Sequence, residues 1–195
     1  MPWQKSFDRK QAIDQAMHLF WLRGYEGTGM ADLVEATGAS RYGLYDEFGD
    51  KRGLFLVALD RYLARLVKPN YRSLNHKNAG LAEIRAFFEG IKAVAGTPAQ
   101  IMGCLMCHTA SRPIAKDSDV AIRVASFMGV MERSFTNALQ NAREAGALPA
   151  GARPRDLAVF LAGLVLAASL LCRSDADGET TRVFLQTGLT VLGEA

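Results

Sequence analysis

Apolar residues recur at helical spacing along almost the whole chain. Over residues 13–20 they follow the i, i+3, i+4, i+7 pattern, and the same spacing returns over residues 81–91 and 124–135. No run of alternating β-branched residues bounded by turn residues is present in the sequence, so strands have little support. The pattern predicts an all-α protein of about nine helices.

Capping residues, glycines and prolines divide this pattern into elements. In the N-terminal part we expect helices over residues 8–24, 30–37, 41–48 and 50–67, the last one stopped before Pro69. After a polar connector over residues 70–80, the expected helices cover residues 81–95, 101–111, 120–145, 155–173 and 179–192.

The N-terminal helices contain the most informative pattern in the chain. Two short helices are separated by Gly38-Ala39-Ser40, which is the short glycine-containing turn of a helix-turn-helix. In that motif the N-terminal residues of the second helix face the bases of the major groove, here Ser40, Arg41, Tyr42 and Gly43. The Arg41 guanidinium can donate to guanine or to a phosphate, and Lys51 begins the next helix, where a phosphate can also bind.

At these residues the sequence resembles the TetR family of transcriptional regulators. The resemblance rests on FWLRGYEGT over residues 20–28, ADLVEATGAS over residues 31–40 and LYDEFGDKRGLF over residues 44–55. It implies a three-helix DNA-binding head joined to a helical body that binds an effector and dimerises. By this resemblance Thr28 and Tyr45 contact phosphates, Lys51 clamps the DNA backbone, and residues 40–43 face bases.

The resemblance also implies a division of the chain and a partner. We expect a helix-turn-helix domain over residues 1–50, a linking helix over 51–69, and an effector-binding and dimerisation domain over 70–195. Two heads of a homodimer would bind a pseudopalindromic double-stranded operator. Three departures affect base preference: Gly29 is a weak cap, Tyr42 is bulky, and Asp46 and Glu47 repel phosphate.

Composition limits how the protein can bind DNA and in which cellular compartment we expect it. The 195 residues are 49% hydrophobic and carry a net charge of +3, so DNA binding must come from local placement rather than from a basic field. Three cysteines, an odd number in a chain of this length, indicate reduced thiols in the cytoplasm. The N-terminus lacks the apolar core of a signal peptide, and the apolar stretch 157–172 is short for a membrane span.

A second motif, GCLMCH over residues 103–108, leaves several interpretations open. It matches the haem-attachment pattern C-x-x-C-H, which needs an exported protein. Cys104, Cys107 and His108 are three potential zinc ligands, to which Cys172 or His76 could add a fourth. Some members of the resembled family detect electrophiles or oxidants through a body cysteine, and a helix N-terminus would favour the Cys104 thiolate. Plain packing of small apolar thiols is the simplest interpretation, and we expect no bound cofactor.

The C-terminal part contains candidate effector and dimer residues. A soft apolar cavity can form around Phe88, Met102, Met106, Met128 and Met131, although the same residues suit an ordinary core. The helix over 157–172 is apolar on all sides, so other apolar surfaces must pack around it. We expect a second subunit to supply part of that packing. The expected dimer residues on this helix and the last one are Leu157, Phe160, Leu161, Leu164, Ala168, Phe184, Thr187 and Val191.

These patterns together predict a DNA-binding regulator. We expect a repressor that a small effector or thiol modification releases from its operator. The alternative is a small helical metal-binding protein or enzyme that uses Cys104, Cys107 and His108. The sequence contains no nucleophile–base set and no phosphate-binding glycine loop, so we expect no catalysis.

Overall fold

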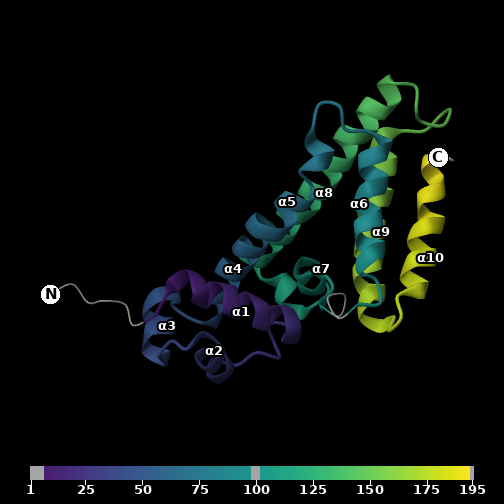
Figure 1. Ribbon diagram of the computed structural model, residues 1–195. Coiled ribbons are helices and arrows are strands. Elements are labelled where there is room, and N and C mark those ends of the chain that lie inside the picture. The colour runs from purple at the N-terminus through teal and green to yellow at the C-terminus, as the bar shows by residue number, and fades with distance from the viewer. Residues whose placement is uncertain (1–6, 98–101, 194–195) are drawn as a thin grey trace. The chain divides into compact units, whose positions relative to one another are not determined.

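The computed structural model describes residues 7–97 and 102–193. All regular structure in these residues is helical, and they contain no strand, which confirms the predicted all-α class (Figure 1). The chain forms two compact units. The first unit is drawn from residues 1–66 and 104–124, and the second unit from residues 67–103 and 125–195.

The first unit is built around four N-terminal helices. They are α1 (Arg9–Arg23), α2 (Met30–Thr37), α3 (Arg41–Phe48) and α4 (Lys51–Tyr62), and α1 packs against both α2 and α4. Phe20 of α1 meets Phe55 of α4 edge to face, with ring centroids 4.9 Å apart. The apolar positions that the helical spacing picked out therefore form a common core, which includes Phe20, Leu33, Leu44, Leu54, Phe55, Ala58 and Leu59.

Local capping chemistry sets the starts of these helices. Asp8 accepts hydrogen bonds from the backbone N–H groups of Lys10 and Gln11. The Ser40 hydroxyl accepts from the N–H of Gly43, and Asp50 accepts from the N–H of Gly53. Each cap satisfies donors that have no partner inside the helix, so the predicted starts of α1, α3 and α4 are confirmed.

Two of the expected helix boundaries are wrong. Helical structure does not end before Pro69: a π-helical turn (Leu63–Val67) follows α4, and α5 (Lys68–Asn70) follows that turn. Pro69 fits because it lies in the first turn of α5, where its missing N–H is not needed. The helix expected over 101–111 is α7 (Leu105–Ala110), because Gly103 has a positive φ of 55° and Cys104 is extended; residue 101 lies outside the described residues.

The second unit is a set of longer helices around an aromatic centre. It contains α6 (Leu81–Val94), residues 125–144 of α8 (Ser118–Glu144), α9 (Pro154–Ser174) and α10 (Glu179–Gly188), which ends in a 3₁₀ turn (Leu189–Leu192). Helix α10 packs against α9 and α6 (Figure 1). The rings of Phe88 and Phe135 stack with centroids 5.7 Å apart, and Tyr71 and Phe87 pack beside them.

The polar connector expected over 70–80 is also ordered. It contains a 3₁₀ turn (Ser73–Asn75), and Leu74 is buried. Asn137 on α8 donates to the carbonyl groups of Leu74 and His76, and Asn141 donates to that of Ala79. Side-chain amides thus satisfy the backbone of a segment that lacks regular structure of its own.

Helix α9 is longer than the apolar stretch that the sequence suggested. It has 21 residues and, by length and composition alone, is the one helix among the described residues that could cross a membrane. Core helices of soluble proteins pass the same test. Helix α9 is not covered on all sides within the chain: Leu161 and Ala168 are buried, whereas Val159 and Leu170 are exposed.

Residues 104–124 pack in the first unit, although the expected division placed them in a domain over 70–195. They comprise α7, a 3₁₀ turn (Pro113–Lys116) and the first residues of α8. We call residues 104–119 the strap, because its contacts follow α4. The Tyr62 hydroxyl accepts from the N–H of Leu105 near one end of α4, and Arg52 binds Asp117 near the other.

Candidate nucleic-acid interface and thiol site

Helix α3 separates its side chains into a core face and a solvent face. Leu44 and Phe48 are buried, whereas Tyr42 is 72% exposed and Tyr45 is 41% exposed. The exposed Arg41 guanidinium lies 5.9 Å from the centroid of the Tyr45 ring, one turn away on the same helix. The structure therefore brings Arg41, Tyr42 and Tyr45 together on the solvent side of a short helix.

Ser40 and Gly43 act at the start of this helix. The Ser40 hydroxyl is the N-cap, so its oxygen already accepts a hydrogen bond from the protein. A Cβ added at Gly43 would lie 3.0 Å from the Phe7 ring and 3.2 Å from the Ser40 hydroxyl oxygen. The missing side chain at position 43 thus makes room for other parts of the protein.

Thr28 and Lys51 belong to a closed network behind the helix-turn-helix. Thr28 is 1% exposed, and its hydroxyl donates to the carbonyl oxygen of Gly24 at 2.8 Å. The Lys51 ammonium donates to the carbonyl oxygens of Tyr25 at 3.0 Å and Thr28 at 2.9 Å, and lies 4.1 Å from the centroid of the Tyr25 ring. Both side chains, expected to contact phosphates, therefore have protein partners that fix the α1–α2 turn.

One of the two acidic residues on α3 also has a partner. Arg9 on α1 donates to the Glu47 carboxylate at 2.5 Å, so the charge of Glu47 is neutralised locally. Asp46 is exposed. From the sequence we expected Asp46 and Glu47 to repel phosphate. The ion pair was not predictable, because Arg9 and Glu47 lie 38 positions apart.

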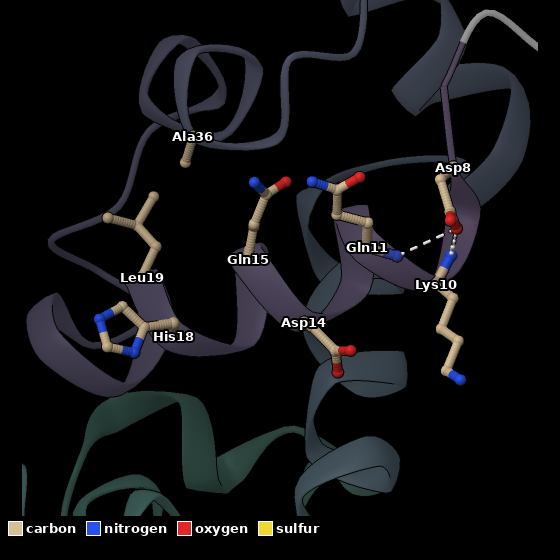
Figure 2. Close-up of a pocket in the computed structure, with 8 residues that line it drawn as sticks. All are labelled: Asp8, Lys10, Gln11, Asp14, Gln15, His18, Leu19 and Ala36. Atoms are coloured by element: carbon tan, nitrogen blue, oxygen red, sulfur yellow. Dashed lines mark hydrogen bonds between the residues drawn. The ribbon is translucent and has the colours of Figure 1, made fainter.

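A groove of about 680 Å³ runs along α1 beside α2 (Figure 2). Gln15 points toward Ala36 of α2, and the Gln15 side-chain oxygen is buried without a hydrogen-bond partner. Asp14 points to the other side of α1, where hydrogen bonds from Arg61, and then Arg65, lower its pKa from the usual value. The groove is lined by Asp8, Lys10, Gln11, Asp14, Gln15, His18, Leu19 and Ala36.

A second groove, of about 570 Å³, lies in the second unit. Its lining comes from α6 and from the end of the chain, and Arg85 there donates to the carbonyl oxygen of Gly193. None of the expected effector residues lines either groove. The lining residues are Arg85, Glu89, Lys92, Gln186, Leu189, Thr190 and Gly193.

The two cysteines of the GCLMCH motif meet at the start of α7. Cys104 is the extended N-cap residue of this helix, with φ −114° and ψ 122°. A hydrogen bond from the Cys107 thiol is the main cause that lowers the pKa of Cys104 to about 7. Hydrogen bonds from the Tyr62 hydroxyl and from the N–H groups of Cys107 and Met106 act in the same direction, whereas burial opposes them. The site favours a thiolate at Cys104.

Tyr62 connects this thiol to α4. Burial raises the pKa of the Tyr62 hydroxyl well above its usual value, and the neighbouring Cys104 raises it further. The hydroxyl therefore keeps its proton and can donate to Cys104, while it accepts from the N–H of Leu105. The Tyr62 ring also packs edge to face on Trp21 of α1, with centroids 5.0 Å apart.

The structure divides the other expected effector residues between the two units. Met106 and His108 lie on α7 in the first unit. Cys172 lies in the second unit, where burial raises the pKa of its thiol. Among the described residues no three His, Cys, Asp or Glu side chains are arranged to hold a metal ion. The expected residues in the second unit are Phe88, Met102, Met128 and Met131.

Charged hydrogen bonds join the C-terminal end of the strap to α4. Arg52 on α4 donates to both carboxylate oxygens of Asp117, at 2.6 and 2.8 Å, and to Asp119 at 2.6 Å. The hydrogen bond from Arg52 lowers the pKa of Asp117 to about 2, against the effect of burial. The N–H of Ile114 donates to Glu26, in the turn after α1. The strap therefore contacts α4 within a few residues of the helix-turn-helix.

Two short helices, a glycine turn and an exposed Arg-Tyr surface on the second helix define a helix-turn-helix DNA-binding protein. Sequence comparison agrees with this class. Residues 12–58 match the model for bacterial regulatory proteins of the tetR family, and residues 80–187 match that for the tetracyclin repressor-like C-terminal domain. The chain belongs to the TetR family, and it is a transcriptional regulator rather than an enzyme.

Individual relatives extend the similarity over nearly the whole chain. The HTH-type transcriptional repressor ComR of Escherichia coli K12 is 35% identical over 179 residues, which cover 90% of this chain and 84% of ComR. The TetR-family regulator CifR, solved as a cysteine mutant with 26-base-pair operator DNA, is 25% identical with a TM-score of 0.83 over 97% of this chain and 98% of CifR. The reduced form of Escherichia coli NemR is 19% identical, covers 96% of this chain and 97% of NemR, and shares the fold with a TM-score of 0.83.

Proposed function

We propose that this regulator binds operator DNA as a homodimer through α3, represses transcription there, and leaves the operator when Cys104 is modified. The observation that carries the DNA-binding part is the solvent face of α3, where Arg41, Tyr42 and Tyr45 are exposed beside the N-cap Ser40. The operator complex of the similar CifR supports double-stranded DNA as the partner.

Different residues take different parts in this proposal. Arg41 donates in a fork to guanine O6 and N7, and the exposed hydroxyl groups of Tyr42 and Tyr45 donate to phosphates or bases. Thr28 and Lys51 support the interface mainly by fixing the α1–α2 turn, since their polar atoms bind carbonyl groups of that turn.

Substitution of Arg41 tests the DNA-binding part. With fluorescently labelled DNA that flanks the coding region, Arg41→Ala should weaken binding by about 1–3 kcal/mol, which is roughly 5- to 150-fold. Arg155→Ala is the matched control, because Arg155 is an exposed arginine on α9. Equal affinity of the Arg41→Ala variant and the wild type would contradict the proposed contact.

The dimer part rests on apolar side chains that the chain leaves uncovered. Val159, Phe160 and Leu170 on α9 are exposed, as are Val183 on α10 and Val191 just after it. Of the expected dimer residues, Leu161, Leu164 and Ala168 are buried by the chain itself, so Phe160 and Val191 remain as the exposed apolar members. Leu157 and Phe184 are half-buried, and Thr187 is exposed.

A second copy of the chain is the occupant that a pseudopalindromic operator requires. Leu170→Glu should convert the dimer to a monomer in sedimentation experiments, since Leu170 is 70% exposed and a buried charge at an interface is costly. Ile122→Glu is the control, because Ile122 is exposed in the first unit. A Leu170→Glu variant that remains dimeric would show that this face does not form the interface.

The response to thiol modification rests on the pKa of Cys104. A thiol with a pKa of about 7 is substantially ionised in a neutral cytoplasm, where we place this protein. CifR was solved with cysteines replaced and NemR in a form described as reduced, which supports a comparable chemistry here. The small-molecule effector that the sequence also allowed is the alternative.

Alkylation separates these possibilities. N-ethylmaleimide should release the wild-type protein from labelled operator, and Cys104→Ser should remain bound after the same treatment. Cys172→Ser is the matched control and should respond like the wild type, because Cys172 is buried in the second unit. Release of the Cys104→Ser variant by N-ethylmaleimide would exclude Cys104 as the sensor.

A further inference from the structure

We infer that Cys104 and Cys107 form an intramolecular disulfide when a hydroperoxide oxidises the protein, and that Tyr62 positions the reacting thiolate. The effect of this bond on operator binding rests on the proposed function. The bond itself does not, because it follows from the arrangement of the three side chains.

The backbone brings the two sulfur atoms together. Residues at i and i+3 of a regular helix are neighbours, but their side chains are poorly aimed for a disulfide. Cys104 is not in the helix: it has extended φ and ψ values and follows Gly103, whose positive φ of 55° favours glycine. The Cys104 side chain is thereby free to turn toward α7, where its sulfur is in hydrogen-bond contact with that of Cys107.

The same contacts define an attacking and a resolving thiol. Cys104 accepts hydrogen bonds from Cys107, Tyr62 and two backbone N–H groups, so its thiolate is the stabilised one. This thiolate attacks an oxygen of hydrogen peroxide; the S–O bond forms, the O–O bond breaks, and the released hydroxide takes a proton to become water. The product is a sulfenic acid at Cys104.

The second step closes the disulfide. The sulfur of Cys107, after losing its proton, attacks the Cys104 sulfur; the S–S bond forms and the S–O bond breaks. The leaving hydroxide takes a proton and departs as a second water. One peroxide is thus reduced to two waters while the two thiols lose two electrons and two protons.

Cys172 has the wrong surroundings for either role. It lies in the second unit, where its thiol is buried, and this burial raises its pKa. A raised pKa lowers the thiolate fraction that either step needs. Cys107 is therefore the resolving cysteine that the first unit itself supplies.

Closure of the bond changes what Tyr62 contacts. The reduced site offers the Tyr62 hydroxyl a thiolate acceptor at Cys104, and a disulfide sulfur carries no charge. Tyr62 lies at the end of α4, and the strap that begins at Cys104 also binds Arg52 at the start of α4. The oxidised strap thus alters contacts along the helix that follows the helix-turn-helix.

Mass spectrometry of the full-length protein tests the disulfide. After reduction, removal of the reductant and one equivalent of hydrogen peroxide, the peptide that contains both Cys104 and Cys107 should lose the mass of two hydrogens. After the protein is denatured, this peptide should no longer react with N-ethylmaleimide, while the Cys172 peptide still reacts. Cys107→Ser should instead gain an oxygen at Cys104, and Cys172→Ser should behave like the wild type.

Other products would overturn the inference. Retention of both reactive thiols after peroxide treatment would do so, as would a bond to Cys172 or a disulfide between two chains on a non-reducing gel. Formation of the Cys104–Cys107 bond without release from the operator would leave the disulfide established and would contradict the redox part of the proposed function. The two outcomes are read from separate measurements on one sample.

The role of Tyr62 has its own test. The rate of Cys104 alkylation in a Cys107→Ser, Cys172→Ser background should rise with pH, and Tyr62→Phe should move the midpoint of that rise to higher pH. The reason is that the variant removes a hydrogen bond to the thiolate. A matched aromatic change, Tyr25→Phe, should leave the midpoint in place. An unchanged midpoint in Tyr62→Phe would exclude Tyr62 as a positioning residue.

Discussion

The interior contacts of the first unit differ in kind from those of the second unit. In the first unit, arginines bind carboxylates from segments far apart in the sequence, as Arg52 binds Asp117 and Arg61 binds Asp14. In the second unit, stacked and edge-to-face rings occupy the centre, with Phe135 contacting Tyr71, Phe87 and Phe88. Asparagine amides then fasten the connector to α8.

This difference has a functional consequence. Apolar contacts are non-directional and depend on area, whereas charged hydrogen bonds depend on geometry and on ionisation. The unit that contains α3 also contains the Cys104 thiol, whose pKa is lowered, and the arginine–carboxylate pairs. In the proposed function, modification of Cys104 therefore acts first on the unit that contains α3, while the second unit offers aromatic packing and exposed apolar side chains.

The largest stability effect should come from the aromatic centre. Phe135→Ala should lower the free energy of unfolding by about 3–5 kcal/mol, because it leaves a cavity among three rings. Urea titration followed by circular dichroism measures it. Val94→Ala, at an exposed position of the same unit, should change stability by no more than about 0.5 kcal/mol. A small loss in Phe135→Ala would remove the contrast between the units.

Lys51 should have the next largest effect, in the first unit. Lys51→Ala should cost roughly 1–3 kcal/mol, because it leaves two carbonyl groups without their charged donor. Urea titration followed by Trp21 fluorescence reports this unit, since Trp21 packs on Tyr62. Operator affinity should fall as well, with an unchanged salt dependence. A smaller salt dependence in the variant would show that Lys51 itself contacts a phosphate.

Ser40 should have a smaller effect. Ser40→Ala removes the N-cap of α3 and should cost about 1 kcal/mol, whereas Ser40→Asp keeps an acceptor for the N–H of Gly43. The aspartate variant separates capping from DNA contact: it should retain stability but lose operator affinity through repulsion of phosphate. Equal stability of the serine and alanine forms would mean that the cap contributes nothing.

Acid should weaken the arginine–carboxylate pairs of the first unit, and the resulting loss of stability should be the smallest of these effects. The pKa of Asp117 is about 2, below its ordinary value of 3.8, and that of Asp14 is also lowered. Each carboxylate therefore stabilises the fold fully above its ordinary pKa and loses this contribution as the pH falls through the folded value. Asp117→Asn should reduce stability near neutral pH and flatten its decline between about pH 4 and pH 2.

A control on the same unit sharpens that test. Asp46→Asn changes an exposed carboxylate on α3, and it should leave both the stability and its acid dependence as in the wild type. A decline in Asp117→Asn as steep as that of the wild type would mean that the tie to Arg52 does not contribute. Urea midpoints from Trp21 fluorescence at several pH values give the comparison.

Local features of the fold were predictable because they depend on neighbouring residues. Asp8, Ser40 and Asp50 cap helices within three positions of themselves, and Gly38 ends α2 in the left-handed conformation. The spacing of apolar residues likewise identified the core of the first unit, with Leu44 and Phe48 buried and Tyr42 and Tyr45 exposed on α3.

Features that depend on distant segments were not predictable. The Lys51 ammonium binds carbonyl groups more than twenty positions earlier, and the strap packs along α4 although it follows α6 in the sequence. The C-x-x-C-H spacing identified Cys104 and Cys107 as candidate residues, but it did not predict their contact with each other. The extended N-cap at Cys104 and the contact with Tyr62 required the folded chain.

We propose that oxidation of a thiol in the unit that contains α3 controls operator binding. One titration tests it directly: operator affinity of a single preparation is measured when reduced, after one equivalent of hydrogen peroxide, and after dithiothreitol. We expect tight binding, loss of binding and recovery, in that order, and we expect Cys104→Ser to bind equally in all three states. Tight binding by the oxidised wild-type protein, with the Cys104–Cys107 bond verified in the same sample, would contradict it.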